Sequence, residues 1–208
     1  MSLTPVLAIP RNHPVLQWFR HRKILVLEQE IPYSPEELIG SAMIRPKEGL
    51  LTDSAFFQLW LSAVIIRKGM ICTFWDTTDK PCHLWIGNNI LQKWLHFQDA
   101  LMTGLLHQAI TRYMDIVFTS PLFTGYLCHQ QDLSQNAFGI LYLVRAESVK
   151  FNNDAVTVKW LRIADIKKKY RKLDPWSKKI FDYIYENPSL REKLGLYQKK
   201  RSISKKTD

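Results

Sequence analysis

Two β-rich runs that meet at a tight turn restrict the fold more than any other feature of the sequence. Phe57 to Arg67 and Met70 to Trp75 are both rich in β-branched and aromatic residues, and Lys68-Gly69 lies between them. Residues of these types favour strands, and a short connection that contains glycine favours a hairpin. The sequence therefore predicts an antiparallel hairpin over residues 57–75.

Helices and further strands are expected around this hairpin. Gln98 to Met114 is the clearest helix, because apolar residues recur along one side of it at helical spacing. Pro175 to Tyr185 predicts a second helix, with Asp174 as its N-cap and Pro188 beyond its end. Short strands are predicted over residues 6–9, 24–27, 83–86, 124–129, 137–145 and 155–161. This order of elements predicts an α/β (α+β) fold in which helices sandwich a mixed β-sheet.

The composition excludes several classes of protein. The chain has 208 residues, of which 46% are hydrophobic, so it is not fully disordered. Its longest nearly apolar run, Phe56 to Ile66, has 11 residues, whereas a membrane-spanning helix needs about 20. Three cysteines cannot supply a disulfide framework at this size, and the N-terminus lacks the pattern of a secretory signal. We therefore expect a cytoplasmic protein that does not associate with a membrane.

The positive charge is concentrated in the C-terminal quarter. The net charge is +10, but residues 1–160 contain 14 Lys and Arg against 13 Asp and Glu, whereas residues 161–208 contain 15 against 6. Two interpretations are open: a solvated surface with a disordered tail, or salt-sensitive contact with a nucleic acid or an acidic protein. The cations that form this basic patch are Lys167, Lys168, Lys169, Arg171, Lys172, Lys199, Lys200 and Arg201.

Several short motifs follow one another in an order that resembles a known family. They are Val6-Leu7-Ala8-Ile9-Pro10-Arg11, Arg45-Pro46 ahead of Gln58, Gly87-Asn88-Asn89-Ile90, residues 138–144, Lys159-Trp160-Leu161 and Trp176-Ser177. Together they resemble Nudix-fold proteins, in particular a bacterial subgroup called phosphoesterases, from about residue 5 to about residue 185. The resemblance implies a Nudix-like domain over residues 1–165. The capping pattern and the charge distribution predict a basic helical element over residues 166–197 and a basic, disordered tail over 198–208. The resemblance also implies a site for a nucleotide-like ligand, for which the candidate residues are Arg45, Arg67, Asn88, Asn89, His107 and Arg112.

The catalytic signature of Nudix hydrolases is not retained. In the box G-x5-E-x7-R-E-U-x-E-E-x-G-U, where U is aliphatic, the glutamates of a helix hold Mg²⁺ beside a diphosphate. Aligning Ile116 with the last position places Gln108 on the arginine and replaces the three glutamates by Ala109, Arg112 and Tyr113. Residues 100–114 contain no acidic residue in any register, so no two carboxylates can share one face of this helix. We therefore expect no Mg²⁺ site there.

Other chemically suggestive residues have ordinary structural explanations. Cys72, Cys82, His83 and Cys128 lack the spacing of a zinc site, and we expect buried, unligated thiols. His107 lies on the polar side of its helix, where it is expected to be exposed or hydrogen-bonded. The members of a Ser-His-Asp triad need not be close in sequence, so the sequence alone leaves that arrangement untested.

These observations predict a non-catalytic Nudix-fold protein that binds a nucleotide-like ligand or serves as an interaction module, without a cofactor. One alternative is a divergent hydrolase whose Mg²⁺ ligands come from elsewhere, such as Asp99, Asp132 or Asp154. The second alternative is weak binding of nucleic acid, independent of sequence, through the basic C-terminus. The oligomeric state stays open.

Overall fold

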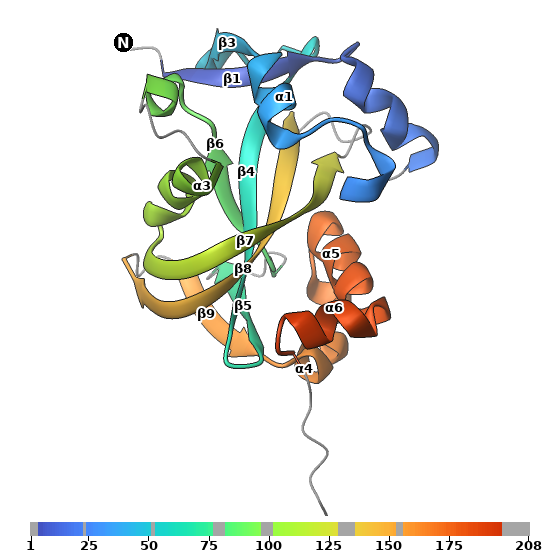
Figure 1. The fold of residues 1–208 in the computed structure, drawn as a ribbon, viewed down its shortest axis with the longest axis vertical. Helices are drawn as coiled ribbons and strands as arrows, with labels where there is room; N and C mark the ends of the chain where they lie inside the picture. The colour runs from blue at the N-terminus through green and yellow to red at the C-terminus, as the bar shows by residue number, and fades with distance from the viewer. Residues whose placement is uncertain are drawn as a thin grey trace, which may run out of the picture.

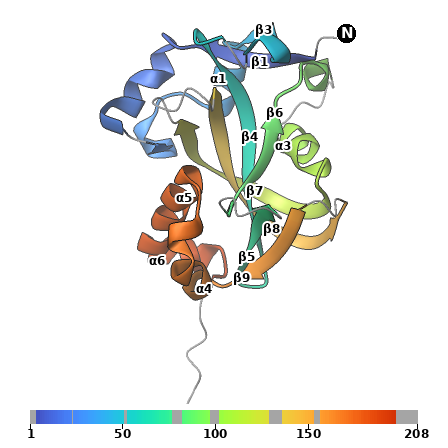
Figure 2. The same cartoon turned by 180° about the vertical axis from the view of Figure 1, so that it is seen from behind.

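The fold is a mixed β-sheet with helices on both faces (Figures 1 and 2). The computed structural model describes residues 4–22, 24–50, 53–76, 82–96, 102–128, 136–152 and 156–196. In this part of the chain the sheet has nine strands, in the order β2-β7-β8-β4-β1-β3, with β5 and β6 paired to β4 and β9 paired to β5. The expected fold class is confirmed. The strands are β1 (Pro5–Pro10), β2 (Leu25–Leu27), β3 (Met43–Pro46), β4 (Phe56–Arg67), β5 (Met70–Asp76), β6 (Ile86–Asn89), β7 (Met114–Cys128), β8 (Ala137–Phe151) and β9 (Val156–Leu161).

The predicted hairpin is formed by β4 and β5. Lys68 and Gly69 both have positive φ, of 49° and 76°, which suits the backbone twist of a two-residue hairpin turn. Only the residues next to the turn pair directly, Ile66 with Ile71 and Arg67 with Met70. Beyond them β5 leaves β4 and pairs with β9, so the hairpin joins two parts of the sheet.

Strand β4 is the centre of the sheet. It runs parallel to β8, from Gln58 opposite Ala137 to Ile66 opposite Arg145, and its other edge pairs with β1, β6 and β5 in turn. Because side chains alternate between the two faces of a strand, β4 supplies two separate hydrophobic cores. Leu59, Leu61, Ala63 and Ile65 belong to the first core, and Val64 and Ile66 belong to the second.

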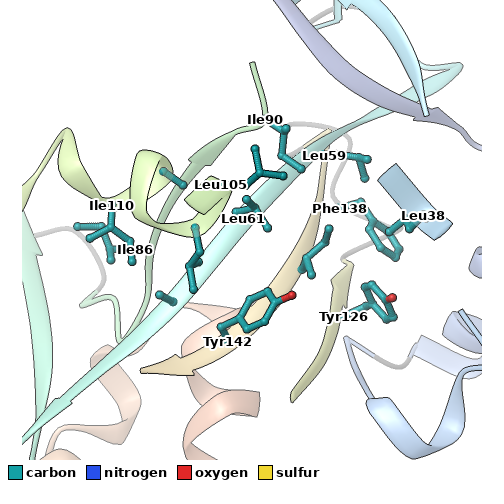
Figure 3. Close-up of a cluster of buried hydrophobic side chains, with 14 of the residues drawn as sticks. Leu38, Leu59, Leu61, Ile86, Ile90, Leu105, Ile110, Tyr126, Phe138 and Tyr142 are labelled. Carbon is teal, nitrogen blue, oxygen red and sulfur yellow. The ribbon is translucent and has the colours of Figure 1, made fainter. Parts of the chain in front are cut away.

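The first core lies between the sheet and the helix α3 (Met102–Thr111). Leu105, Leu106, Ala109 and Ile110 of α3 are all buried, as the helical periodicity predicts. Figure 3 shows two of them, Leu105 and Ile110, near Leu61 of β4 and Ile86 of β6. On the same side of the sheet, the rings of Tyr126 and Phe138 lie 5.6 Å apart.

The helix predicted over residues 98–114 is too long at its C-terminal end. Residues 97–101 lie outside the described part of the chain, and Met114 begins β7, where it pairs with Phe151. Apolar periodicity could not locate this end because Met114 is also buried in the strand. The strand predicted over 124–129 is correspondingly longer, and three register shifts against β8 accommodate its bending.

The strand predicted over residues 83–86 is displaced toward the C-terminus. Strand β6 runs from Ile86 to Asn89, and Gly87 pairs with Ser62 of β4. A Cβ atom on Gly87 would lie 2.2 Å from the carbonyl oxygen of Leu61, so a residue without a side chain is needed here. Asn88 and Asn89 consequently lie in strand β6, paired with Leu61 and Trp60.

Helices at the two ends of the chain complete the fold. Ser34 caps α1 and forms a capping box with Glu37. Asp174 caps α5 as predicted, and Asn187 both ends α5 and caps α6. The helices other than α3 are α1 (Pro35–Gly40), α2 (Lys47–Leu50), α4 (Ile163–Lys168), α5 (Pro175–Glu186) and α6 (Pro188–Lys193), with 3-10 turns at Pro14–Arg22, Glu28–Glu30, Gln92–His96 and Tyr170–Lys172.

The second core lies under α5 and α6, on the sheet face opposite α3 (Figure 2). Trp176, Ile180 and Ile184 of α5 are buried there together with residues of β4, β7 and β8. The predicted basic tail, residues 198–208, lies outside the described part of the chain and stays a prediction. Within the described residues, no helix is long and apolar enough to cross a membrane.

Candidate functional site

The outer side of α3 is polar and carries no carboxylate. Thr103, His107 and Gln108 are exposed on the helix, and the exposed Arg112 follows its last turn. The His107 ring lies 6.1 Å from the ring of Phe118, and the Arg112 guanidinium lies 6.0 Å from the ring of Tyr113. The helix therefore offers hydroxyl, amide, imidazole and guanidinium groups to a ligand.

Asp115, the acidic residue that follows α3, already accepts a hydrogen bond within the protein. Asp115 is the second residue of β7, and its Oδ1 accepts a hydrogen bond from Asn152 Nδ2 at 2.8 Å. The other carboxylates suggested as relocated metal ligands, Asp99, Asp132 and Asp154, lie outside the described residues. In the part of the chain that the structure describes, no three His, Cys, Asp or Glu side chains are placed to hold one metal ion.

The six residues predicted to bind a ligand do not form one group. Arg45 lies on β3, which β1 separates from the first residues of β4. Its guanidinium lies 4.7 Å from the centre of the Phe56 ring, at the start of β4. Arg67 is the last residue of β4, roughly 35 Å from Phe56 at the rise of an extended strand. No single site for a small ligand includes both arginines. His107 lies on α3, and Arg112 directly follows the helix. The aligned box residues Gln108 and the buried Ala109 lie between them, and Tyr113 follows Arg112.

Asn88 and Asn89 lie on opposite faces of the sheet. Asn88 pairs with Leu61, which belongs to the core under α3, whereas Asn89 pairs with Trp60 on the other face. Asn89 is fully buried, and its Nδ2 donates a hydrogen bond to Gln58 Oε1 at 2.5 Å. Asn88 is half-buried, and its Oδ1 accepts from the backbone N–H of Asn89. Only Asn88 is therefore on the same side as α3.

The strongest polar cluster in the described structure was not predicted from the sequence. His83 Nδ1 lies 3.0 Å from Asp174 Oδ2, and the Ser177 hydroxyl donates a hydrogen bond to the same oxygen. Asp174 Oδ1 accepts from the backbone N–H groups of Trp176 and Ser177. The cluster thus joins the segment before β6 to the first turn of α5.

This cluster is not a nucleophilic triad, although it contains Ser, His and Asp. In a triad the histidine lies between the serine and the aspartate, whereas here Asp174 lies between Ser177 and His83. The Ser177 hydroxyl is fully buried and accepts from Leu84 N–H at 2.8 Å. Burial raises the pKa of Asp174, but hydrogen bonds from His83 and Ser177 outweigh this and lower it below the ordinary value. The carboxylate is therefore a structural N-cap.

A second unpredicted cluster joins three strand ends. Arg11 Nη2 donates to Asn136 Oδ1 at 2.5 Å, and the guanidinium lies 4.0 Å from the Phe57 ring. Asn136 Nδ2 in turn lies within hydrogen-bond distance of the carbonyl oxygens of Leu50 and Asp53. These contacts connect the residues after β1 with the residues before β4 and β8. The resemblance had drawn attention to Arg11, but its partner Asn136 is 125 residues away.

The three cysteines are buried free thiols, as the sequence predicted. Burial raises the pKa of Cys128 and of Cys82 to about 12, with the charge of Asp174 adding to the effect at Cys82. Burial also raises the pKa of Cys72. The thiolate is the form that attacks electrophiles and binds metals, so these groups are unreactive at neutral pH.

The basic patch lies partly on aromatic side chains. Lys167 Nζ donates to the Tyr185 hydroxyl at 2.5 Å, and Lys169 Nζ lies 5.3 Å from the centre of the Trp75 ring. Lys168 forms an exposed ion pair with Asp165 at 3.6 Å. Arg171 and Lys172 are exposed, and Lys199, Lys200 and Arg201 lie outside the described residues.

The sheet, with α3 on one face and α5 on the other, defines a Nudix fold. The solved structure of Tm1382, described as a candidate Nudix hydrolase, superposes on this chain with a TM-score of 0.72; the match covers 88% of this chain and 98% of Tm1382. The sequence identity is 15%, so this likeness concerns the fold alone.

Weaker structural likenesses extend to other proteins. DR0079 from Deinococcus radiodurans matches with a TM-score of 0.46 at 12% identity, over 78% of this chain and 98% of DR0079. A MutT protein from Bacillus halodurans matches with a TM-score of 0.43 at 8% identity, over 63% of this chain and 84% of that one. No protein-family model and no curated protein matches the sequence.

Proposed function

We propose that this chain is a Nudix-fold protein that binds a nucleotide-like ligand without hydrolysing it through Mg²⁺. One observation carries the proposal: the outer side of α3 presents Thr103, His107 and Gln108, with Arg112 beyond its end, and no carboxylate. In the Nudix box this helix supplies the glutamates. Mg²⁺ prefers carboxylate oxygens, so the residues present on α3 do not suit it. We therefore assign no metal-dependent step to this helix.

The same side chains suit direct contact with an anion. Phosphate and glutamate are both negatively charged, so a phosphate next to several glutamates needs a cation between the two. Guanidinium and amide groups, in contrast, donate hydrogen bonds to a phosphate oxygen directly. Arg112 is permanently charged, and His107 and Gln108 lie five and four residues before it, slightly more than one helical turn. On this proposal the phosphates of the ligand contact these side chains directly. Hydrolysis of the phosphates is not expected, because α3 has no carboxylates to hold the Mg²⁺ that the reaction needs.

Ligand binding is expected to be independent of divalent cations. ATP, a dinucleotide and ADP-ribose would be screened by thermal shift and isothermal titration, with and without Mg²⁺ or Mn²⁺. We expect at least one of them to raise the melting temperature equally in both conditions, without release of phosphate or a nucleoside monophosphate. Arg112→Ala should weaken that binding by about tenfold, the size of one hydrogen bond to a charged group.

Lys179→Ala is the matched control for the effect of Arg112→Ala on ligand affinity. Lys179→Ala removes an exposed cation from α5, on the opposite face, and should leave the affinity unchanged. Micromolar Mg²⁺ binding that disappears when Asp99, Asp132 or Asp154 is changed to Asn, together with hydrolysis, would instead establish the divergent hydrolase.

The basic C-terminus supports a second candidate function, because residues 161–208 carry a net charge of +9. On this alternative, full-length protein binds duplex DNA weakly at about 50 mM salt and loses it by about 200 mM, without preference for sequence. Deleting residues 199–208 removes five Lys and Arg and one Asp, and should abolish this binding without changing the melting temperature. Fluorescence anisotropy checks it; absence of binding at low salt, or binding unchanged by the deletion, rejects the alternative.

A further inference from the structure

More than half of the excess positive charge of the C-terminal quarter lies on its folded part. Residues 161–196 contain ten Lys and Arg against five Asp and Glu, a net of +5, whereas residues 197–208 contain five against one, a net of +4. Three of the five acidic residues before the tail are already engaged: Asp165 pairs with Lys168, Asp174 caps α5, and Asp182 accepts from the Tyr170 hydroxyl. The folded C-terminal element is therefore itself a basic surface.

The indole ring of Trp75 lies beside this surface and carries two lysines. Trp75 is half-buried on β5, and its ring centre lies 5.4 Å from Lys159 Nζ and 5.3 Å from Lys169 Nζ. Lys159 belongs to β9, which pairs with β5, and Lys169 directly follows α4. Both lysines are exposed, so the part of the ring next to their ammonium groups lies at the surface of the protein.

A buried threonine fixes the orientation of this indole. Thr73 Oγ1 accepts a hydrogen bond from Trp75 Nε1 at 3.0 Å and donates one to the carbonyl oxygen of Lys159 at 2.8 Å. The ring is therefore held in place before any ligand arrives, and its N–H group is already satisfied. What the indole offers to solvent is its face, which stacks on any base and does not distinguish one base edge from another.

Tyr185 of α5 is a second aromatic ring with cations beside it. Its ring centre lies 4.4 Å from Lys167 Nζ and 5.7 Å from the guanidinium of Arg191. The ring is stacked on that of the buried Phe181, with centres 5.4 Å apart and planes at 22°, which supports it from within.

Helix α4 connects the two rings. Lys167, beside Tyr185, and Lys169, beside Trp75, are two residues apart at its C-terminal end. Figures 1 and 2 both show α4 next to β9 at one end of the molecule, together with α5 and α6. Aromatic rings and cations thus alternate over one continuous part of the surface.

The lysines do not prevent a base from stacking on the rings. A cation over an exposed ring is held less strongly than a base stacked on the same ring. A base can therefore displace an ammonium group, and the displaced lysine, on its flexible stem, can contact the phosphate that adjoins the base. Cations that follow the backbone and rings that stack on bases are the combination by which proteins bind single strands without reading their sequence.

We propose that Trp75 and Tyr185, with the cations beside them, form a binding surface for single-stranded nucleic acid. Bases stack on the two rings, and the phosphates contact Lys159, Lys167 and Lys169. The surface depends neither on ligand binding at α3 nor on residues 199–208, to which the second candidate function assigns the binding of duplex DNA.

The probe is a fluorescent oligothymidine of about 12 nucleotides, a length within the range of single-strand binding sites. Anisotropy at about 50 mM salt measures its binding to the full-length protein and to the protein without residues 199–208. We expect both to bind it, the full-length protein to bind it more tightly than a duplex of the same length, and an oligoadenosine to bind about equally well. Arg112→Ala on α3 should leave this binding unchanged, so the proposals can fail separately.

Two pairs of variants test the aromatic rings. Trp75→Leu keeps an apolar side chain against the second core and should weaken binding by about fivefold or more, the loss of one base stack. Trp18→Leu, at a half-buried tryptophan near the other end of the chain, should not. Tyr185→Leu should weaken binding similarly, whereas Tyr185→Phe, which keeps the ring, should retain it.

The salt dependence tests the lysines. Lys159→Gln should make the plot of log affinity against log salt shallower by ~0.7, the value for one phosphate contact on a single strand. Lys93→Gln removes an exposed cation elsewhere and should leave the slope unchanged.

Several results would overturn the proposal. Binding that disappears when residues 199–208 are deleted would assign it to the tail alone. Wild-type affinity in both Trp75→Leu and Tyr185→Leu would show that no base stacks on these rings. Competition by polyglutamate as effective as that by unlabelled oligothymidine would show that the surface attracts any polyanion, an acidic protein included. Absence of binding at low salt would reject the surface outright.

Discussion

Asp174→Ala is expected to lower the free energy of unfolding by about 3 kcal/mol, because several buried donors lose their acceptor together. The buried donors are the N–H groups of Trp176 and Ser177 and the Ser177 hydroxyl; the partly exposed His83 also loses its partner. Loss of an ordinary N-cap costs about 1 kcal/mol, and each donor left buried and unpaired adds to this. Equilibrium unfolding in urea, followed by circular dichroism, measures the difference.

The control for this variant is Asn187→Ala. Asn187 caps the short helix α6 through a single hydrogen bond to Leu190 N–H, so its removal should cost about 1 kcal/mol. Equal losses in the two variants would mean that Asp174 acts only as an N-cap and that His83 adds nothing.

The pH dependence of stability provides a second readout at Asp174. Its native pKa lies below the ordinary value, since the hydrogen bonds from His83 and Ser177 outweigh the effect of burial. The contribution of the ionised group is therefore complete above the pKa of an unfolded carboxyl, about 4, and is lost as the pH falls through the lower native pKa. Asp174→Asn should flatten this part of the stability profile; a profile identical to wild type would contradict the lowered pKa.

Gly87→Ala is expected to destabilise the fold by about 3 kcal/mol or more, through a clash between backbones. The added Cβ would lie 2.2 Å from the Leu61 carbonyl oxygen and 2.9 Å from Ser62 Cα. Neither atom belongs to a movable side chain, so β6 must separate from β4. A loss of this size in a chain of about 200 residues lowers the melting temperature by roughly 6–12 °C.

The matched control is Gly40→Ala. Gly40 is the last residue of α1, and an added Cβ would meet no atom within 4 Å. We expect its melting temperature to equal or slightly exceed that of the wild type, because alanine suits a helix better than glycine. If Gly87→Ala melts like Gly40→Ala, then β6 does not approach β4 as closely as described.

Local patterns predicted the elements whose boundaries depend on neighbouring residues. The hairpin at Lys68-Gly69 and the start of α5 at Asp174-Pro175 were both correct, since turn and cap preferences act over a few residues. The predicted end of α3 was wrong because an apolar residue such as Met114 can be buried equally well in a helix or in a strand. The displacement of β6 had a related cause: Asn88 and Asn89 carry weak strand preferences that pairing with β4 overrides.

The sequence by itself determined the fold class, and it determined that residues 100–114 carry no carboxylate for a metal. These properties depend on composition and on short-range periodicity, which can be read along the chain. Only the tertiary structure decided which polar groups meet. His83 and Asp174 are 91 residues apart, and the adjacent Asn88 and Asn89 lie on opposite faces of the sheet. Strand pairing and the alternation of side chains bring distant residues together and separate adjacent ones, and no local pattern encodes that outcome.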